Sequence, residues 1–134
     1  MPLISAPKGV LRLAVLRMLS ESSMSGTDLA ERVARETAGE WRPGPGSLYL
    51  ILSELLRKGL IHELPKRGGN VRRYIISAKG KEEMGRMSAS ARDDVGKQLR
   101  LLGIFARMAG DRPLEESLAA AGAGLAERRG QGNA

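Results

Sequence analysis

Residues 45–76 read PGSLYLILSELLRKGLIHELPKRGGNVRRYII, and the spacing of the apolar residues changes within this stretch. In its first part, apolar residues recur three and four positions apart, which predicts a helix that Pro45 can begin and Gly59 can end. Beyond Gly59, two short runs at 60–64 and 71–76 are rich in β-branched and aromatic residues, which is typical of strands. The six residues between these runs contain Pro and Gly-Gly. The stretch therefore predicts a helix followed by a β-hairpin, which must pack on other elements to be stable.

Upstream of this stretch the sequence predicts two further helices. Residues 8–19 carry a wide apolar face broken by only three basic side chains, which is typical of a mostly buried helix. After a polar break, Ser25 and Asp28 have the spacing of a capping box, and a second helix is predicted from there to Glu36. Residues 38–46 cannot continue that helix, because two prolines remove amide donors and the glycines loosen the backbone. The order helix, helix, turn, helix, hairpin is that of a winged helix-turn-helix, whose third helix enters the DNA major groove.

Downstream of the hairpin, Ser77 is placed to cap a long helix over residues 78–109. About 30 helical residues span on the order of 45 Å. This is more than a winged unit needs for its own core, so we expect the helix to pair with a second copy of the chain. Apolar residues recur along it three and four positions apart and form the predicted dimer interface: Met84, Met87, Ala91, Val95, Leu99, Leu102 and Ala106.

These patterns predict a fold that is mainly α with a small β-hairpin wing, an α+β arrangement. We expect a winged helix-turn-helix domain over residues 1–78 and a dimerisation helix over residues 79–110. A Pro-containing break then leads into a tail over residues 111–134, which is expected to be a short helix at 114–128 or disordered.

The composition narrows the classes of function. The 134 residues include 22 Lys and Arg against 15 Asp and Glu, which gives a formal net charge of +7. A basic chain attracts polyanions such as nucleic acid or an acidic membrane surface. The absence of cysteine excludes disulfides and thiolate metal sites, and His62 is the only histidine. No apolar run approaches the roughly 20 residues of a membrane span, and residues 1–7 lack the pattern of a secretion signal. We therefore expect a cytoplasmic protein without a metal or cofactor.

Basic residues concentrate at the tip and the return strand of the hairpin. Lys66, Arg67, Arg72 and Arg73 fall within eight residues, and no acid lies among them. An ordinary solvated surface usually mixes both signs, so this concentration favours contact with DNA phosphates. Because side chains alternate along a strand, Arg72 and Arg73 face opposite sides. One of the two is expected to bind phosphate and the other to serve the protein itself.

Four motifs, in order along residues 8–85, resemble those of PadR-type transcriptional regulators. Residues 45–49, Pro-Gly-Ser-Leu-Tyr, are similar to the Pro-Gly-(Thr or Ser)-Leu-Tyr that opens the family's recognition helix, and the Lys-Gly-Leu-Ile at 58–61 is similar to its end. The Gly- and Arg-rich stretch 67–74 resembles the family's wing, and residues 77–80 resemble the Leu-Thr-x-x-Gly that begins its last helix. The resemblance implies a repressor-like dimer whose last long helix pairs with the partner subunit.

Two positions depart from the family pattern. Gly44 stands where the family often has Ser or Thr, which weakens the N-cap of the third helix by roughly a few tenths of a kcal/mol. Thr27 stands where an aromatic residue often follows the glycine at position 26, so no contact of that aromatic is carried over to this chain. From about Met87 onward the chain matches by period rather than by motif, and the dimer geometry is not carried over either.

The third helix and the wing together form the predicted DNA-binding surface. Its residues are Arg42, Gly46, Ser47, Tyr49, Lys66, Arg67, Asn70 and Arg72. The first turn of a helix offers amides to a phosphate, and Tyr49 can reach a phosphate or a base edge, or can pack against the wing. No Asn, Gln or Arg occurs between Gly46 and Glu54, so paired hydrogen bonds to bases are scarce. We therefore expect phosphate contacts and DNA shape to carry more of the selectivity.

The leading hypothesis is a homodimeric, sequence-specific regulator of transcription that binds a palindromic operator in double-stranded DNA. In keeping with the resemblance, it is expected to be a repressor. Two alternatives stay open: a winged-helix module that docks on another protein, and a chromatin-like protein that binds DNA without sequence preference. An enzyme is not expected, because the sequence offers no nucleophile–base set, metal cluster or phosphate loop. The resemblance is compatible with a small-molecule effector of unspecified chemistry, and Trp41 is either a core anchor or part of an apolar ligand pocket.

Overall fold

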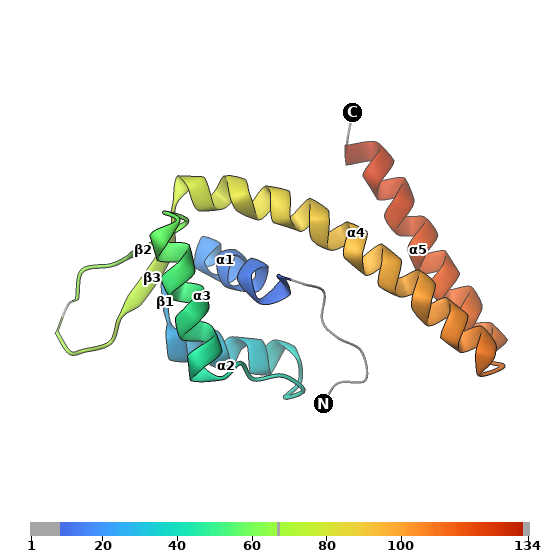
Figure 1. Cartoon of the computed structure of the whole chain (residues 1–134), viewed down its shortest axis with the longest axis horizontal. Coiled ribbons are helices and arrows are strands. Elements are labelled where there is room, and N and C mark those ends of the chain that lie inside the picture. Colours follow the sequence, from blue (N-terminus) through green and yellow to red (C-terminus); the bar gives the residue numbers. More distant parts are fainter. Residues whose placement is uncertain (1–8, 67, 133–134) are drawn as a thin grey trace. The chain divides into compact units, whose positions relative to one another are not determined.

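The computed structural model describes residues 9–66 and 68–132 (Figure 1). Its elements, in chain order, are α1 (Val10–Glu21), β1 (Met24–Ser25), α2 (Gly26–Glu36), α3 (Pro45–Arg57), β2 (Ile61–Glu63), β3 (Arg73–Ile76), α4 (Ala78–Met108) and α5 (Arg112–Gly132). The chain divides into two compact units. We call the described residues up to Met87 the winged unit and those from Ser88 onward the C-terminal unit, so α4 contributes to both.

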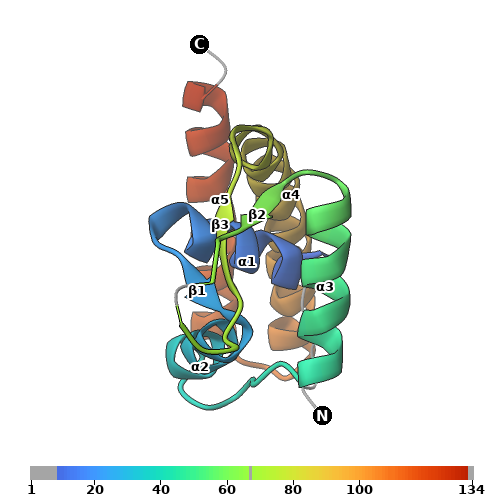
Figure 2. The same ribbon diagram turned by 90° about the vertical axis from the view of Figure 1, so that its left-hand side faces the viewer.

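The winged unit has the predicted winged helix-turn-helix order, and its sheet has one strand more than the hairpin. The three antiparallel strands lie in the order β1-β3-β2 (Figure 2). Met24 of β1 pairs with Tyr74, and Ile61 of β2 pairs with Ile76. The sequence predicted only a polar break at β1, because a strand of two residues is too short to show a period of two. Beyond the paired residues, the hairpin projects away from the helices of this unit (Figure 1).

Each helix of the winged unit begins where local chemistry allows it. At α2 the predicted capping box is confirmed, because the Asp28 amide donates to Ser25 Oγ and the Ser25 amide donates to Asp28 Oδ2, both at 3.1 Å. The hydrogen bond from the Ser25 amide lowers the pKa of Asp28. At α3 the N-cap is Gly44, which offers no side-chain cap, and Pro45 follows in the first turn, where its missing N–H leaves no bond unmade.

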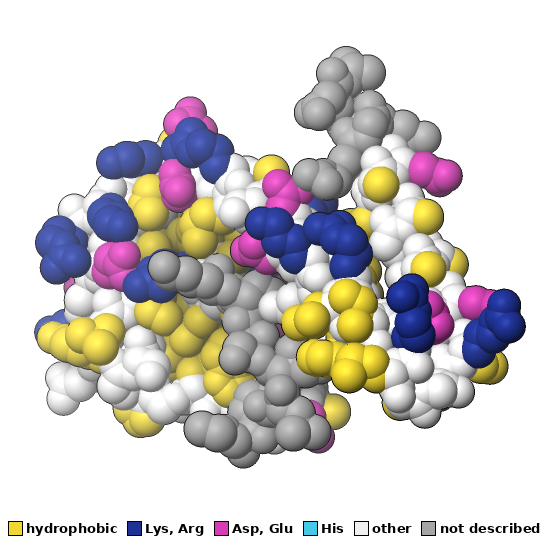
Figure 3. Space-filling model, turned by 45° about the vertical axis from the view of Figure 1, so that its right-hand side comes forward, with side chains coloured by type: hydrophobic (Ala, Val, Ile, Leu, Met, Phe, Trp, Pro, Cys, Tyr) yellow, Lys and Arg dark blue, Asp and Glu magenta, His cyan; other side chains and the backbone are white. Residues whose placement is uncertain are grey.

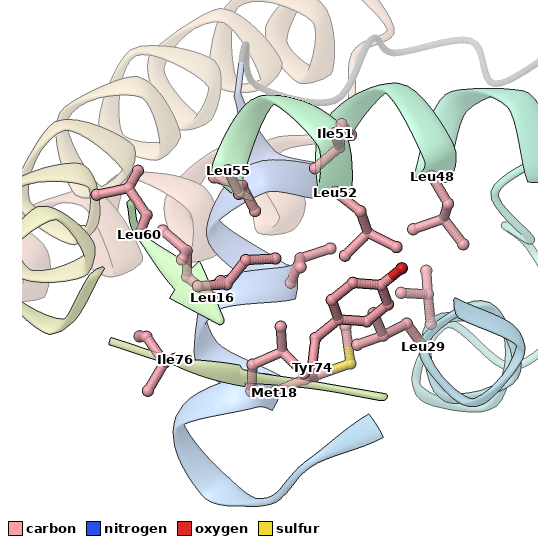
Figure 4. Close-up of a cluster of buried hydrophobic side chains, with 14 of the residues drawn as sticks. Leu16, Met18, Leu29, Leu48, Ile51, Leu52, Leu55, Leu60, Tyr74 and Ile76 are labelled. Atoms are coloured by element: carbon pink, nitrogen blue, oxygen red, sulfur yellow. The ribbon is translucent and has the colours of Figure 1, made fainter. Parts of the chain in front are cut away.

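The core of the winged unit lies between α1, α2, α3 and the sheet. Leu48 and Leu52 of α3 point toward the ring of Tyr74 and toward Leu29 of α2 (Figure 4). The core residues are Val15, Leu16, Met18, Leu19, Leu29, Ala30, Val33, Leu48, Ile51, Leu52, Leu55, Leu60, Ile61, Tyr74 and Ile76. Trp41 packs against this cluster, partly buried, so it acts as a core anchor at the edge of the winged unit.

The start of α4 is fixed tightly against the turn before β2. The buried Ser77 donates from Oγ to the carbonyl of Gly59 at 2.6 Å and accepts from the Gly80 amide at 3.0 Å, so the predicted cap is confirmed. The Ser77 amide donates to the carbonyl of Leu60 at 3.0 Å. Two hydrogen bonds from Ser77, to the carbonyls of Gly59 and Leu60, therefore hold the start of α4 to the turn before β2.

The C-terminal unit contains the rest of α4 and the whole of α5. The turn between them includes Gly110 at a φ of 75°, and Asp111 Oδ1 accepts from the Leu114 amide at 3.1 Å, which caps α5. Arg107 and Glu115 form an ion pair of 2.8 Å across the turn. The helix α5 is longer than the short helix predicted at 114–128. It begins at Arg112, with Pro113 in its first turn, where proline is tolerated, and it continues to Gly132.

An ion pair between α1 and α3 lowers the pKa of a carboxyl group in the winged unit. Glu54 accepts from Arg12 at 2.7 Å and from Lys58 at 3.0 Å. These contacts lower the pKa of Glu54 from 4.5 to about 2. The hydrogen bond from Arg12 has the largest effect, and the hydrogen bond from Lys58 the second largest. A lowered carboxyl pKa adds stability that is fully present above the unfolded value and is lost as pH falls toward the folded one.

We therefore expect Glu54→Gln to remove part of the loss of stability that the wild-type chain shows between about pH 4.5 and pH 2. Urea unfolding followed by circular dichroism across this range measures the effect. Arg12→Gln is the matched partner variant. It should also reduce the change in the free energy of unfolding over this pH range, because it removes the principal cation beside Glu54. If the free energy of unfolding changes equally with pH in the wild type and in Glu54→Gln, the ion pair does not link stability to pH.

Candidate nucleic-acid interface

The helix α3 turns one face to the core and another to solvent. Leu48, Ile51, Leu52 and Leu55 are buried, whereas the predicted site residues Gly46, Ser47 and Tyr49 are exposed together with Leu50. Tyr49 is 67% exposed, so packing against the hairpin does not bury it. An exposed first turn leaves its backbone amides accessible to an anion.

A cavity of about 440 Å³ lies beside this face and gathers three of the predicted site residues. Arg42 from the loop before α3, Tyr49 from α3 and Arg72 from the hairpin all line it. Its lining also includes the N-terminal turns of α2 and α3 and the apolar side chains of Leu52 and Tyr74. The structure thus brings together side chains that are up to 30 positions apart in the sequence, two of them guanidinium groups.

The two adjacent arginines of the hairpin have different surroundings. Arg73 donates from Nη2 to the carbonyl of Ser23 at 2.9 Å, and its Nη1 lies 3.5 Å from Asp28 Oδ2. The hydrogen bond to Ser23 fastens β3 to the loop before β1, and the longer contact with Asp28 reaches the first turn of α2. Arg72 lines the cavity, is 58% exposed and, among the described residues, has a long ion pair of 3.5 Å with Glu63 as its one interaction. Alternation along the strand therefore leaves Arg72 as the arginine available to a ligand and commits Arg73 to the protein.

The remaining predicted site residues lie on the hairpin. Lys66 and Asn70 are exposed, and Arg67 lies outside the described residues. Val71, which the sequence reasoning did not single out, is 64% exposed and lines the same cavity as Arg72. The sequence shows only an apolar residue shortly after the Gly-Gly turn. Because residues near a turn are commonly exposed, this position does not indicate a binding site.

A second surface of interest lies in the C-terminal unit, where hydrophobic side chains gather in the open (Figure 3). Its exposed members, which we call the apolar patch, are Val95, Leu101, Ile104, Phe105, Met108 and Leu114. Only Val95 belongs to the stripe that the sequence predicted. Of that stripe, Met84 and Met87 pack against the core of the winged unit and Ala106 is 4% exposed within a single chain. Ala91, Leu99 and Leu102 are half-buried.

Two further features bear on the class of protein. None of the helices that the structure describes is long and apolar enough to cross a membrane. Within the same described residues, no three His, Asp or Glu side chains come together in a way that could hold a metal ion.

Comparison with known proteins adds a family and a set of similar folds. The sequence model of the "Transcriptional regulator PadR-like family" matches residues 15–86. A transcriptional regulator from Clostridium thermocellum is similar in structure, with a TM-score of 0.62 and 18% identity over 66% of this chain and 87% of that one. A PadR-like regulator from Bacillus cereus has a TM-score of 0.60 and 24% identity, covering 71% and 93%. PadR of Bacillus subtilis, solved in complex with operator DNA, has a TM-score of 0.51 and 14% identity, covering 88% and 96%. Comparison with curated protein sequences gives no significant match.

The matched region covers more than half of the chain and contains α2, α3 and the hairpin, which are the elements that build the surface around the cavity. The structural likenesses, all below 25% identity, support the fold. The chain belongs to the PadR-like family of transcriptional regulators, which are not enzymes.

Proposed function

We propose that this regulator is a cytoplasmic repressor that binds a palindromic operator in double-stranded DNA as a homodimer. The third helix would enter the major groove, and the hairpin would contact the adjacent backbone. The observation that carries the proposal is the shared location of Arg42, Tyr49 and Arg72 around one cavity beside the exposed face of α3. The Bacillus subtilis neighbour with operator DNA supports the same use of the fold.

The charge distribution on this surface supports phosphate binding. Arg42 and Lys66 are exposed, and the ion pair of Arg72 to Glu63 is a long one. Guanidinium and ammonium groups that neutralise phosphates release condensed counterions, so affinity falls steeply with salt. A face that docks on another protein through apolar contact would respond to salt far less.

Homodimer formation is supported by the apolar patch of the C-terminal unit. Six large hydrophobic side chains of this unit are exposed in a single chain, and exposed hydrophobic surface on a small protein commonly marks a contact with another protein. A two-fold dimer would place two copies of α3 on two half-sites about one turn of DNA apart, near 34 Å. The operator would then be two-fold symmetric in sequence.

We expect Arg72→Gln to weaken operator binding by about tenfold and to reduce the slope of log K against log salt by about one per protomer. The operator is first selected from a pool of random duplexes, and affinity is then measured by fluorescence anisotropy at several salt concentrations. Lys81→Gln is the matched control, since it removes the same charge from an exposed position of α4 outside the cavity lining.

Three results would speak against the proposal. Equal salt slopes for Arg72→Gln and Lys81→Gln would remove Arg72 from the phosphate contacts. Binding without any selected sequence would indicate a chromatin-like protein. Failure to bind any duplex at low salt would contradict DNA binding altogether and would leave docking on another protein as the function of this surface.

A further inference from the structure

The exposed face of α3 lacks the side chains that read bases by paired hydrogen bonds. Between Gly46 and Glu54 the helix has no Arg, Lys, Asn or Gln. Its two serines, Ser47 and Ser53, each offer one hydroxyl, which accepts or donates at many base edges and so discriminates weakly. Selection of a base by this helix therefore needs another kind of contact.

Leu50 is the residue of α3 that stands out on this face. Leu50 is 69% exposed, although its neighbours Ile51 and Leu52 are buried in the core. It follows Ser47 by three positions, so the two lie on the same side of the helix, with Leu50 one turn further in. A helix that places the amides around Ser47 at a phosphate would carry Leu50 into the groove.

The major-groove edge of one base alone carries an apolar group. Thymine presents its 5-methyl group there, whereas the other edges present hydrogen-bond donors and acceptors. An aliphatic side chain gains by covering that methyl group and loses by covering an unpaired polar edge. Tyr49, also exposed, adds a second largely apolar surface beside Leu50.

We infer that Leu50 selects thymine in each half of the operator through contact with the 5-methyl group. The inference rests on the proposed function, because it assumes that α3 enters the major groove. It adds the chemical identity of the base that the middle of α3 reads and the residue that reads it.

The test replaces the thymines of the selected operator with deoxyuridine, one symmetric pair of positions at a time. Deoxyuridine lacks the methyl group but keeps every hydrogen-bonding group and charge. At one pair of positions the wild-type chain should lose roughly 15-fold in affinity, the change expected for removing one buried methyl group from each of the two half-sites. Leu50→Ala should bind the thymine operator more weakly and should no longer distinguish thymine from deoxyuridine at these positions.

Leu50→Met is the matched control, because it keeps an apolar side chain of similar volume and should keep the preference for thymine. The exposure of Leu50 makes both variants compatible with folding. If deoxyuridine has no effect at any position while the operator remains tightly bound, the inference is overturned and the proposed function stands. If Leu50→Ala still prefers thymine, another residue makes the contact. If no duplex is bound, the proposed function itself fails.

Discussion

Gly80→Ala is expected to destabilise the winged unit by at least about 3 kcal/mol, which for a small domain can prevent folding. A Cβ at this position would lie 2.0 Å from the carbonyl oxygen of Leu60 and 2.7 Å from Cγ1 of Ile76. The carbonyl cannot move aside freely, because it also accepts the hydrogen bond from the Ser77 amide at 3.0 Å. Adding a methyl group here therefore forces the first turn of α4 away from the turn before β2.

The effect is measured by urea or thermal unfolding followed by circular dichroism. Gly85→Ala is the matched control. It makes the same substitution five residues further along α4, where an added Cβ would meet nothing within 4 Å. Because glycine is a poor helix former, Gly85→Ala should raise stability by up to about 1 kcal/mol. Similar unfolding midpoints for the two variants would show that α4 does not approach Leu60 this closely.

Much of the winged unit could be predicted from the sequence, because its helices show the helical spacing of apolar residues and recognisable capping residues. The capping box at Ser25 and Asp28, the proline at position 45 and the glycine at position 59 all act within a few residues of where they stand in the chain. The strand β1 could not be predicted in this way. Its two residues become a strand only because β3, about 50 positions later, pairs with them.

The same distinction applies to the candidate interface. Alternation along a strand predicts that Arg72 and Arg73 point to opposite sides, but not which side faces the protein. The choice is made by Ser23 and Asp28, which are distant in the sequence and accept hydrogen bonds from Arg73. A local pattern therefore predicts that one arginine is available, whereas tertiary contacts decide that it is Arg72.

The helix α4 presents a harder case, because it is apolar on more than one side. The predicted stripe through Leu99, Leu102 and Ala106 has the regular spacing of an interface, yet a second run at Leu101, Ile104, Phe105 and Met108 has helical spacing as well. Periodicity cannot show which run the rest of the chain covers. In the structure Ala106 is buried, while Met108 is 78% exposed, so the second run is the more exposed one and is the one that we propose for the dimer contact.

We therefore expect the double variant Phe105→Glu/Met108→Glu to convert the protein from a dimer of twice 14.4 kDa to a monomer of 14.4 kDa. Burying each of these side chains contributes about 1.5–3 kcal/mol, and two-fold symmetry repeats the contribution in the second protomer. Replacing them with charges should raise the dissociation constant of the dimer at least about 1000-fold. Sedimentation equilibrium or light scattering over a range of concentrations measures the change.

The same variant tests the link between dimer formation and DNA binding. A dimer binds its second half-site as an intramolecular step, so loss of the dimer should lower affinity for a full operator by about 100-fold or more, with little effect on a single half-site. Phe105→Leu/Met108→Leu keeps the patch apolar and should stay dimeric. Because both side chains are exposed in the single chain, the charged variant should retain the helical circular dichroism of the wild type. A charged variant that stays folded and dimeric would exclude the apolar patch as the interface and return the choice to the half-buried stripe through Leu99 and Leu102.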